Sequence, residues 1–227
     1  MNILALDTCT ESCSAALFYQ GQLFERVEMT QRGHSDLILG MMDELFRQAN
    51  TTISEVEVLA FGRGPGSFTG VRVGVGVAQG IAFARDIPVV AISSLAAVAQ
   101  EAAEQFEQEY IAVAMDARMG EIYCASFQVV DGLVQLLDEE RGCPPEQFMP
   151  QSEQEWLAAG TGWGVYLQQL SDNFAGKLSE VSVSLFPQSR NIIKLAQPEI
   201  DAGHMVSADK ATPVYLRNNV AKKKGEQ

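Results

Sequence analysis

The order of apolar and polar positions predicts that the chain begins with short strands. Three apolar runs are separated by polar turns, and the first run ends in an aspartate. These runs cover residues 3–7, residues 14–19 and the stretch from residue 23 onward. Apolar runs of this length between turn residues are typical of β-strands, and the short Gly21-Gln22 turn indicates an antiparallel meander.

The second half of the chain repeats this order. Three further runs, the first again ending in an aspartate, cover residues 111–116, 122–130 and 133–137. In each half a later apolar run enters a turn of alternate glycines, A-x-G-x-G-x-G, at residues 60–66 and 158–164. Two matches in the same order indicate two copies of one βββαβα unit. Glycine turns follow strands in many α/β proteins, so a chance match stays open as the alternative.

Helical spacing marks the segments between these strands. Residues 34–50 carry apolar side chains on two adjacent lines, formed by Leu37, Met41 and Leu45 and by Ile38, Met42 and Phe46. Further helices are predicted over residues 71–85, 94–107, 165–174 and 191–197, and a buried strand over residues 88–92. The tail at residues 213–217 is expected to return over the first half of the chain, ahead of a cationic end.

The duplicated unit predicts an α/β protein of two lobes. The first lobe is expected to comprise residues 1–103 together with residues 205–227, and the second lobe residues 104–204. Duplicated units of this kind resemble the actin, hexokinase and Hsp70 superfamily. That resemblance implies a ribonuclease-H-like fold in each lobe and a nucleotide site between the lobes.

Charge argues against a protein that binds nucleic acid by itself. The 227 residues hold 16 Lys and Arg against 29 Asp and Glu, a net charge of −13. Residues 101–160 hold thirteen carboxylates against two arginines, a net of −11, whereas the cations cluster after residue 209. Phosphate binding needs clustered cations, so the acidic middle is expected to face away from any RNA.

Composition and the first residues predict a cytoplasmic protein. The start lacks a basic segment, Asp7 interrupts its apolar run, and no apolar stretch is long enough to span a bilayer. The four cysteines form no C-x-x-C pair, which favours reduced thiols in the core.

The turn after the first strand carries the first candidate chemistry. Asp7, Thr8 and Thr10 form a hydroxyl-rich turn after a strand, a place where a backbone can hold a phosphate or a cation. The superfamily usually has a glycine after this aspartate, and here Thr8 and Cys9 follow. We therefore interpret the turn as a vestigial nucleotide loop, with an aspartate that only stabilises its own turn as the equal alternative.

A glycine-rich segment is the most informative stretch of the sequence. Its loop comprises Gly62, Arg63, Gly64, Pro65, Gly66, Ser67 and Thr69. Glycines allow a close backbone approach, and Ser67 or Thr69 can cap the helix behind them. That helix carries glycines four apart, at 70 and 74 and at 76 and 80. Each costs roughly 1 kcal/mol against alanine, so a close neighbour is expected, either the chain's own sheet or a second protein.

No catalytic or metal-binding set can be placed in the sequence. His34 and His204 are far apart, and neither has a second ligand at metal spacing. No Ser-His-Asp arrangement is present either. A free-standing actin-superfamily nucleotide-binding enzyme or phosphotransferase remains the alternative function, with Asp7 and Asp116 as its candidate carboxylates.

Four segments together resemble one known family, TsaB, also called YeaZ. They are Asp7-Thr8-Cys9-Thr10, His34-Ser35-Asp36-Leu37, the stretch from Gly62 to Gly74, and Pro213-Val214-Tyr215-Leu216-Arg217. They are similar to the family's D-T-S-T, H-S-x-x-L, G-x-G-P-G-S-F-T-G-x-R-x-G and P-x-Y-L-R motifs. The resemblance covers nearly the whole chain, and Cys9 in place of serine is its one small departure.

The resemblance implies a non-catalytic subunit of the bacterial machinery that makes threonylcarbamoyladenosine beside the anticodon of tRNA. Its paralogue TsaD, the transferase, carries an H-x-x-x-H metal motif where this chain has residues 91–97 without a histidine. The implied partners are a TsaD-like transferase and a TsaE-like ATPase, with a homodimer when the chain is alone and tRNA reached only through the complex. No cofactor is expected in the isolated chain, and ATP or ADP only in the assembled complex.

We predict that two helices form half of a four-helix interface with the partner. The first offers paired methionines, which suit adaptable contacts, and the second offers glycines, which suit close approach. The predicted contact residues are His34, Leu37, Ile38, Met41, Met42, Leu45, Gly70, Arg72, Val73, Gly74 and Val77. Of the two glycine lines, the line of Gly70 and Gly74 is expected to face the partner.

Overall fold

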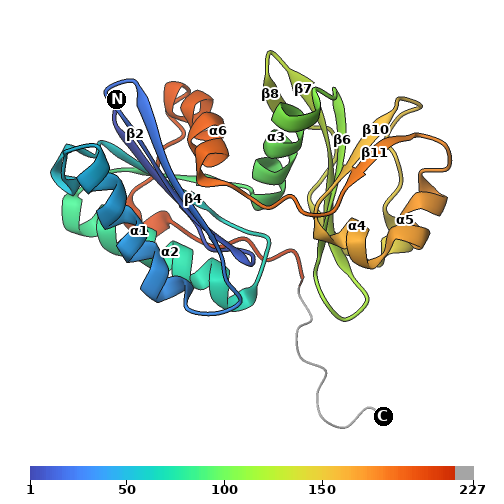
Figure 1. Ribbon diagram of the computed structural model, residues 1–227, viewed down its shortest axis with the longest axis horizontal. Coiled ribbons are helices and arrows are strands. Elements are labelled where there is room, and N and C mark those ends of the chain that lie inside the picture. The colour runs from blue at the N-terminus through green and yellow to red at the C-terminus, as the bar shows by residue number, and fades with distance from the viewer. Residues whose placement is uncertain (218–227) are drawn as a thin grey trace, which may run out of the picture.

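The computed structural model describes residues 1–217 and contains two β-sheets (Figure 1). The first sheet has the order β3-β2-β1-β4-β5. Its strands are β1 (Ile3–Asp7), β2 (Ser12–Tyr19), β3 (Gln22–Met29), β4 (Val58–Gly62) and β5 (Val89–Ile92). The first three strands pair as the predicted antiparallel meander, and β4 and β5 continue in parallel. Helices α1 (His34–Gln48) and α2 (Phe68–Arg85) lie side by side on one face of this sheet, and the 3-10 turn η1 (Ile53–Glu55) precedes β4.

The second sheet repeats the order of the first, which confirms the predicted duplication. It runs β11-β10-β6-β7-β8, with β9 added to β7. Its strands are β6 (Tyr110–Asp116), β7 (Ile122–Val130), β8 (Leu133–Leu136), β9 (Arg141–Cys143), β10 (Trp156–Ala159) and β11 (Leu178–Ser182). The remaining elements of this lobe are η2 (Pro145–Gln147), α4 (Thr161–Val165) and α5 (Leu167–Asn173). The helix predicted over residues 165–174 is interrupted at Tyr166, whose backbone is not helical.

The two lobes exchange a helix. Helix α3 (Ser94–Phe106) follows the first sheet in sequence but packs on β6, β7 and β8 of the second. Helix α6 (Ser189–Asp201) follows the second sheet but packs on β1, β2, β4 and β5 of the first. Between the lobes, both helices join one continuous cluster of buried apolar side chains. The predicted first lobe, residues 1–103 with 205–227, contains most of α3, and the predicted second lobe, residues 104–204, contains α6. Each helix packs on the sheet of the lobe to which the predicted bounds do not assign it.

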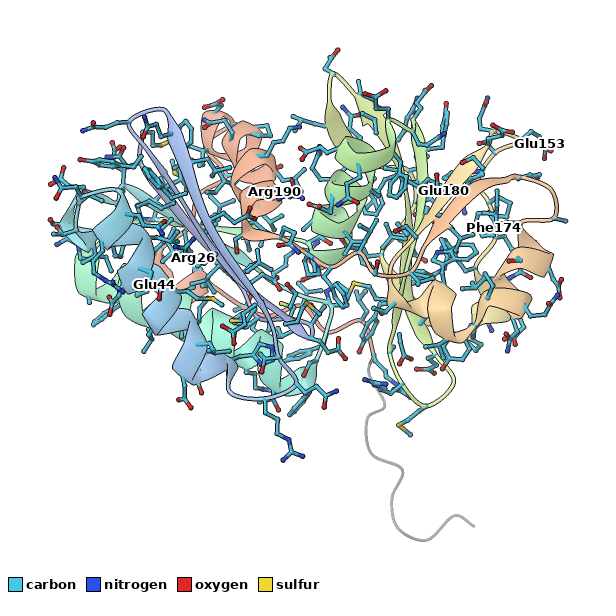
Figure 2. All side chains as sticks on the ribbon, viewed as in Figure 1. Arg26, Glu44, Glu153, Phe174, Glu180 and Arg190 are labelled. Carbon is cyan, nitrogen blue, oxygen red and sulfur yellow. The ribbon has the colours of Figure 1, made fainter. Side chains whose placement is uncertain are left out.

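An ion pair ties the exchanged helices together. Arg190 of α6 points toward the second lobe (Figure 2) and donates to both carboxylate oxygens of Glu101 on α3, at 2.5 and 2.6 Å. Asn191 donates to the same carboxylate at 2.7 Å, and Arg190 also reaches Glu25 on β3 at 3.2 Å. Glu101 is buried, so the pairing supplies the charge and hydrogen bonds that a buried carboxylate needs.

The segment after α6 returns over the first lobe, as the sequence predicts. Residues 205–217, here named the C-terminal strap, bond to β5 through Val206 and pass under α2 through the turn η3 (Ala208–Lys210). The amide of Val214 then donates to the carbonyl of Arg63 at 2.8 Å. Arg217 crosses to the second lobe and pairs with Glu121 at 2.7 Å. The cationic end, with Lys222 to Lys224, lies outside the described residues.

No helix within residues 1–217 has the length and apolarity needed to cross a membrane.

Candidate functional site

Asp7, the aspartate at the end of β1, is completely buried. The amide of Cys9 donates to its Oδ1 at 2.9 Å, and the hydroxyl of Ser94, at the start of α3, donates to Oδ2 at 3.5 Å. Among residues 1–217 no cation pairs with this carboxylate. Burial therefore dominates and raises the pKa of Asp7 from 3.8 to about 7, although the hydrogen bonds from Cys9 and Ser94 oppose the rise.

The glycine loop closes directly over this turn. A Cβ added at Gly62 would overlap the Asp7 carboxylate, and one at Gly66 would overlap the carbonyl of Cys9. The amide of Ser67 donates to that carbonyl at 2.7 Å, and the Thr8 hydroxyl donates to the carbonyl of Gly70 at 2.7 Å. The alternate glycines thus bring the backbone of the loop against the aspartate turn. Asp7 and Thr8 are both fully buried beneath the loop.

The other residues predicted for these two loops have structural contacts. Thr10 is only partly buried, and its carbonyl lies 2.8 Å from Nε2 of His34. Arg63 reaches across to Glu140 of the second lobe at 2.9 Å. Ser67 caps α2 by accepting from the Gly70 amide at 3.4 Å, as predicted, whereas Thr69 is exposed. Gly64 and Pro65 are buried, and the Gly64 carbonyl accepts from the Ser94 amide.

A cleft of about 840 Å³ opens between the lobes beside the glycine loop. Its walls include Thr10, Arg32, His34, Phe68, Arg118 and Tyr215. Strap residues 214–217 form part of its wall. Beside the cleft, the guanidinium of Arg72 lies 3.2 Å from the ring centre of Phe68 and 4.9 Å from that of Tyr215. Within the described part of the chain no three His, Cys, Asp or Glu side chains are grouped to hold a metal ion.

The structure corrects the interface predicted on α1. Ile38, Met41, Met42 and Leu45 are at most 7% exposed and pack in the core of the first lobe against β1, β2 and α2. Leu37 and His34 are partly buried. The broad apolar face that suggested adaptable contacts is therefore the face that covers the sheet. Leu39, beside this face, is the exposed large apolar residue of α1, with 52% of its surface accessible.

The structure also reverses the predicted orientation of α2. Gly70 lies against the carbonyl of Thr8, and a Cβ at Gly74 would stand 2.7 Å from the Thr8 hydroxyl, so this line faces inward. Gly76 and Gly80 have no neighbouring atom within 4 Å of an added Cβ. The open line continues to Phe83, which is 82% exposed. Along its side lie Arg72, which is exposed, and Val73 and Val77, which are partly buried.

We name Leu39, Gly76, Gly80 and Phe83 the outer helix face. Leu39 and Phe83 are 52% and 82% exposed, and no atom lies within 4 Å of a Cβ added at Gly76 or Gly80. Figure 1 shows their helices, α1 and α2, side by side on the first sheet. Leu39 and Phe83 are not among the contact residues predicted from the sequence. For Phe83 the sequence carries a signal, because Phe83 follows Gly76 and Gly80 at spacings of seven and three residues, which is one side of a helix.

Comparisons with known proteins agree over nearly the whole chain. The family model for TsaD, tRNA N6-adenosine threonylcarbamoyltransferase, matches residues 27–225. The tRNA threonylcarbamoyladenosine biosynthesis protein TsaB of Haemophilus influenzae is 42% identical, with 99% of this chain and 97% of that protein covered. Its counterpart in Escherichia coli is 37% identical, with 99% and 98% covered. The solved structure of YeaZ from Pseudomonas aeruginosa is 40% identical and superposes with a TM-score of 0.89, over 95% of this chain and 99% of that one.

Proposed function

The chain belongs to the TsaB (YeaZ) family and takes part in forming threonylcarbamoyladenosine in tRNA, and we propose that it does so as a non-catalytic subunit. In this role it binds a TsaD-like transferase and holds it in its working arrangement. The transferase acts on the adenosine beside the anticodon, and this chain supplies a surface rather than reacting groups.

The outer helix face is the observation that carries this proposal. Glycine in a helix interior costs roughly 1 kcal/mol against alanine, and the inward contacts that justify Gly70 and Gly74 do not exist for Gly76 and Gly80. Small residues on an exposed helix let a second helix approach closely. Phe83 beside them supplies the exposed aromatic side chain that commonly anchors a protein interface.

The partners follow from the same surface. We assign the outer helix face to the TsaD-like subunit, whose two matching helices would complete a four-helix contact. A second copy of this chain uses the face when the transferase is absent. A TsaE-like ATPase joins the pair, and tRNA reaches the chain only through the assembled complex, because a net charge of −13 repels phosphate.

We propose that nucleotide binds to the assembled complex and not to the isolated chain. The isolated chain holds Asp7 and Thr8 under the glycine loop, so the turn that would grip a phosphate is closed. ATP or ADP would then bind only where a second subunit completes a site.

Turnover measurements test the non-catalytic role. The purified chain should neither hydrolyse ATP nor modify tRNA, and it should restore threonylcarbamoyladenosine formation when added to a TsaD-like and a TsaE-like subunit. Asp7→Asn should support that restored activity as well as the unchanged protein does. Robust turnover by the chain alone, lost in Asp7→Asn, would overturn the proposal.

A further inference from the structure

Two cysteines of the second lobe lie beside each other on paired strands. Cys124 is on β7 and Cys143 is on β9, and their Sγ atoms are 3.6 Å apart. In the strand register Cys124 pairs with Arg141 and Cys143 with Ile122, so the cysteines are diagonal neighbours. A disulfide bond is about 2 Å long, so the sulfurs must approach by about 1.6 Å to join. Diagonal neighbours on paired strands lie about 7–8 Å apart, so closure also requires a shift of the backbone of β9 toward β7.

The environment of the pair makes its two sulfurs unequal. The hydrogen bond with the Cys124 thiol lowers the pKa of Cys143 below its ordinary value, and Arg141 adds to the effect against the cost of burial. The same contact raises the pKa of Cys124 well above its ordinary value. Cys143 is 5% exposed, whereas Cys124 is fully buried. The thiolate is the reactive form, so Cys143 is the sulfur that a small oxidant meets first.

The other two cysteines provide a contrast within the chain. Burial raises the pKa of Cys9 well above its ordinary value, and burial raises that of Cys13 to about 12. Both thiols are fully buried in the first lobe, where Cys9 donates to the carbonyl of Gly62. Neither therefore combines thiolate character with access to solvent.

We propose that Cys124 and Cys143 form a peroxide-sensitive dithiol site that closes reversibly to a disulfide. The Cys143 thiolate attacks one oxygen of hydrogen peroxide, the O–O bond breaks, and a sulfenic acid and hydroxide form. The Cys124 sulfur then attacks the Cys143 sulfur and displaces the hydroxyl group, and the Cys124 proton leaves with it as water. Two thiols lose two electrons and two protons in total, and one peroxide becomes two waters.

The position of the pair gives this closure a structural consequence. Glu140, immediately before β9, pairs with Arg63 of the glycine loop at 2.9 Å. Gly142, between Arg141 and Cys143, lies against the carbonyl of Leu216 in the C-terminal strap. Strand β9 and the residue before it therefore form one place where the second lobe meets both the glycine loop and the strap. A disulfide to β7 would hold this contact point fixed.

Peptide mapping of the full chain tests the site. After treatment with hydrogen peroxide and alkylation of the remaining thiols under unfolding conditions, a non-reducing tryptic digest should yield one disulfide-linked peptide pair, Cys124 with Cys143. Dithiothreitol should return all four cysteines to the alkylated form. Cys13→Ala, the matched control, should retain the linked pair, and Cys143→Ala should lose it.

The unchanged protein decides the question even if Cys143→Ala folds poorly. Four alkylated cysteines after peroxide treatment, a different linked pair, or oxidation of Cys143 to the sulfinic acid without a link would each overturn the proposal. Amide hydrogen exchange tests the consequence for the lobes. Exchange at residues 141–143 and at the Val214 amide should slow on oxidation, and equal rates in the two forms would refute the fixed contact point.

Discussion

In the first lobe the glycine turn leads from β4 into α2, a helix of 18 residues, whereas the matching turn of the second lobe leads from β10 into α4, which has five. Both turns bring glycine against the first strand of their sheet. In the first lobe the glycines of the turn enclose Asp7. In the second lobe Gly160 lies against the carbonyl of Ala114. Asp116, the counterpart of Asp7, stays partly exposed and pairs with Arg118 at 3.0 Å.

The comparison indicates that the glycine turn contributes to folding in both lobes, whereas only the helix after the first turn contributes a surface for association. Trp163 stands within the second glycine turn, donates to the carbonyl of Ala112 at 3.0 Å and stacks edge-on against Phe174. Both side chains belong to a buried cluster rich in aromatic residues, and Figure 2 shows Phe174 within that lobe. In the first lobe the helix α2 is long, and no atom lies within 4 Å of a Cβ added at Gly76 or Gly80 on its outer line. The same scaffold therefore serves packing in one lobe and, we propose, association in the other.

The largest difference in stability is expected between alanine substitutions at an inward-facing and at an outward-facing glycine of α2. Gly70→Ala places a methyl group into the carbonyl of Thr8, so it should cost more than about 3 kcal/mol in the free energy of unfolding or prevent folding. Gly76→Ala meets open space and should raise that free energy by about 1 kcal/mol. Urea denaturation of both variants measures the two values, and equal effects would contradict the assignment of inner and outer lines.

The buried Asp7 should make the stability of the protein depend on pH. Because burial raises the pKa of Asp7 from 3.8 to about 7, the folded state holds its proton more tightly than the unfolded state. The corresponding stability is complete below about pH 4 and is lost as pH rises toward 7. At about 1.36 kcal/mol per pKa unit the loss is at most about 4 kcal/mol.

Asp7→Asn should remove this loss, since the amide oxygen can still accept from Cys9. Relative to the unchanged protein, the variant should gain stability between pH 4 and pH 8 in urea denaturation. Asp116→Asn breaks a pair with an arginine that is 74% exposed, so it should change stability by less than about 1 kcal/mol at either pH. A parallel pH dependence in Asp7→Asn and the unchanged protein would refute the buried, uncharged state of Asp7.

A smaller effect is expected at the helix exchange that joins the lobes. Glu101→Gln leaves a side chain of the same shape but removes the charge that Arg190 grips, and it should cost about 2 kcal/mol because Arg190 is partly solvated. Glu104→Gln is the matched control on the same helix. Its pair with Lys194 is exposed, so its cost should stay below about 1 kcal/mol. Equal costs in urea denaturation would show that the buried pair has no special part in joining the lobes.

Local sequence patterns predicted the duplicated fold because the first strand of each half ends in an aspartate and a later strand of each half enters a turn of alternate glycines. The exchange of α3 and α6 could not be predicted, since both helices are amphipathic and either sheet offers an apolar face. The prediction of which side of α2 faces outward was wrong for a similar reason. Gly70 with Gly74 and Gly76 with Gly80 have the same spacing, and only the turn at Thr8, distant in sequence, decides which line is inside.

The prediction of an interface on α1 was wrong because paired methionines suit a core as well as a contact surface. Met41 and Met42 belong to an apolar face wide enough to cover a sheet, and the structure uses them in that way. The exposed Leu39 and Phe83 have meaning as a surface only once the buried face is known.

The most direct test of the proposed role is the mass of the assembly formed with the TsaD-like subunit, measured by analytical ultracentrifugation for Gly80→Leu. Leucine at this open position should leave the unfolding midpoint unchanged or higher, yet prevent the close approach of a partner helix. Gln169→Leu, at an exposed position of α5, is the control and should assemble normally. We predict that Gly80→Leu remains a folded, separate chain, whereas a full-mass assembly formed by this variant would contradict the assignment of the outer helix face.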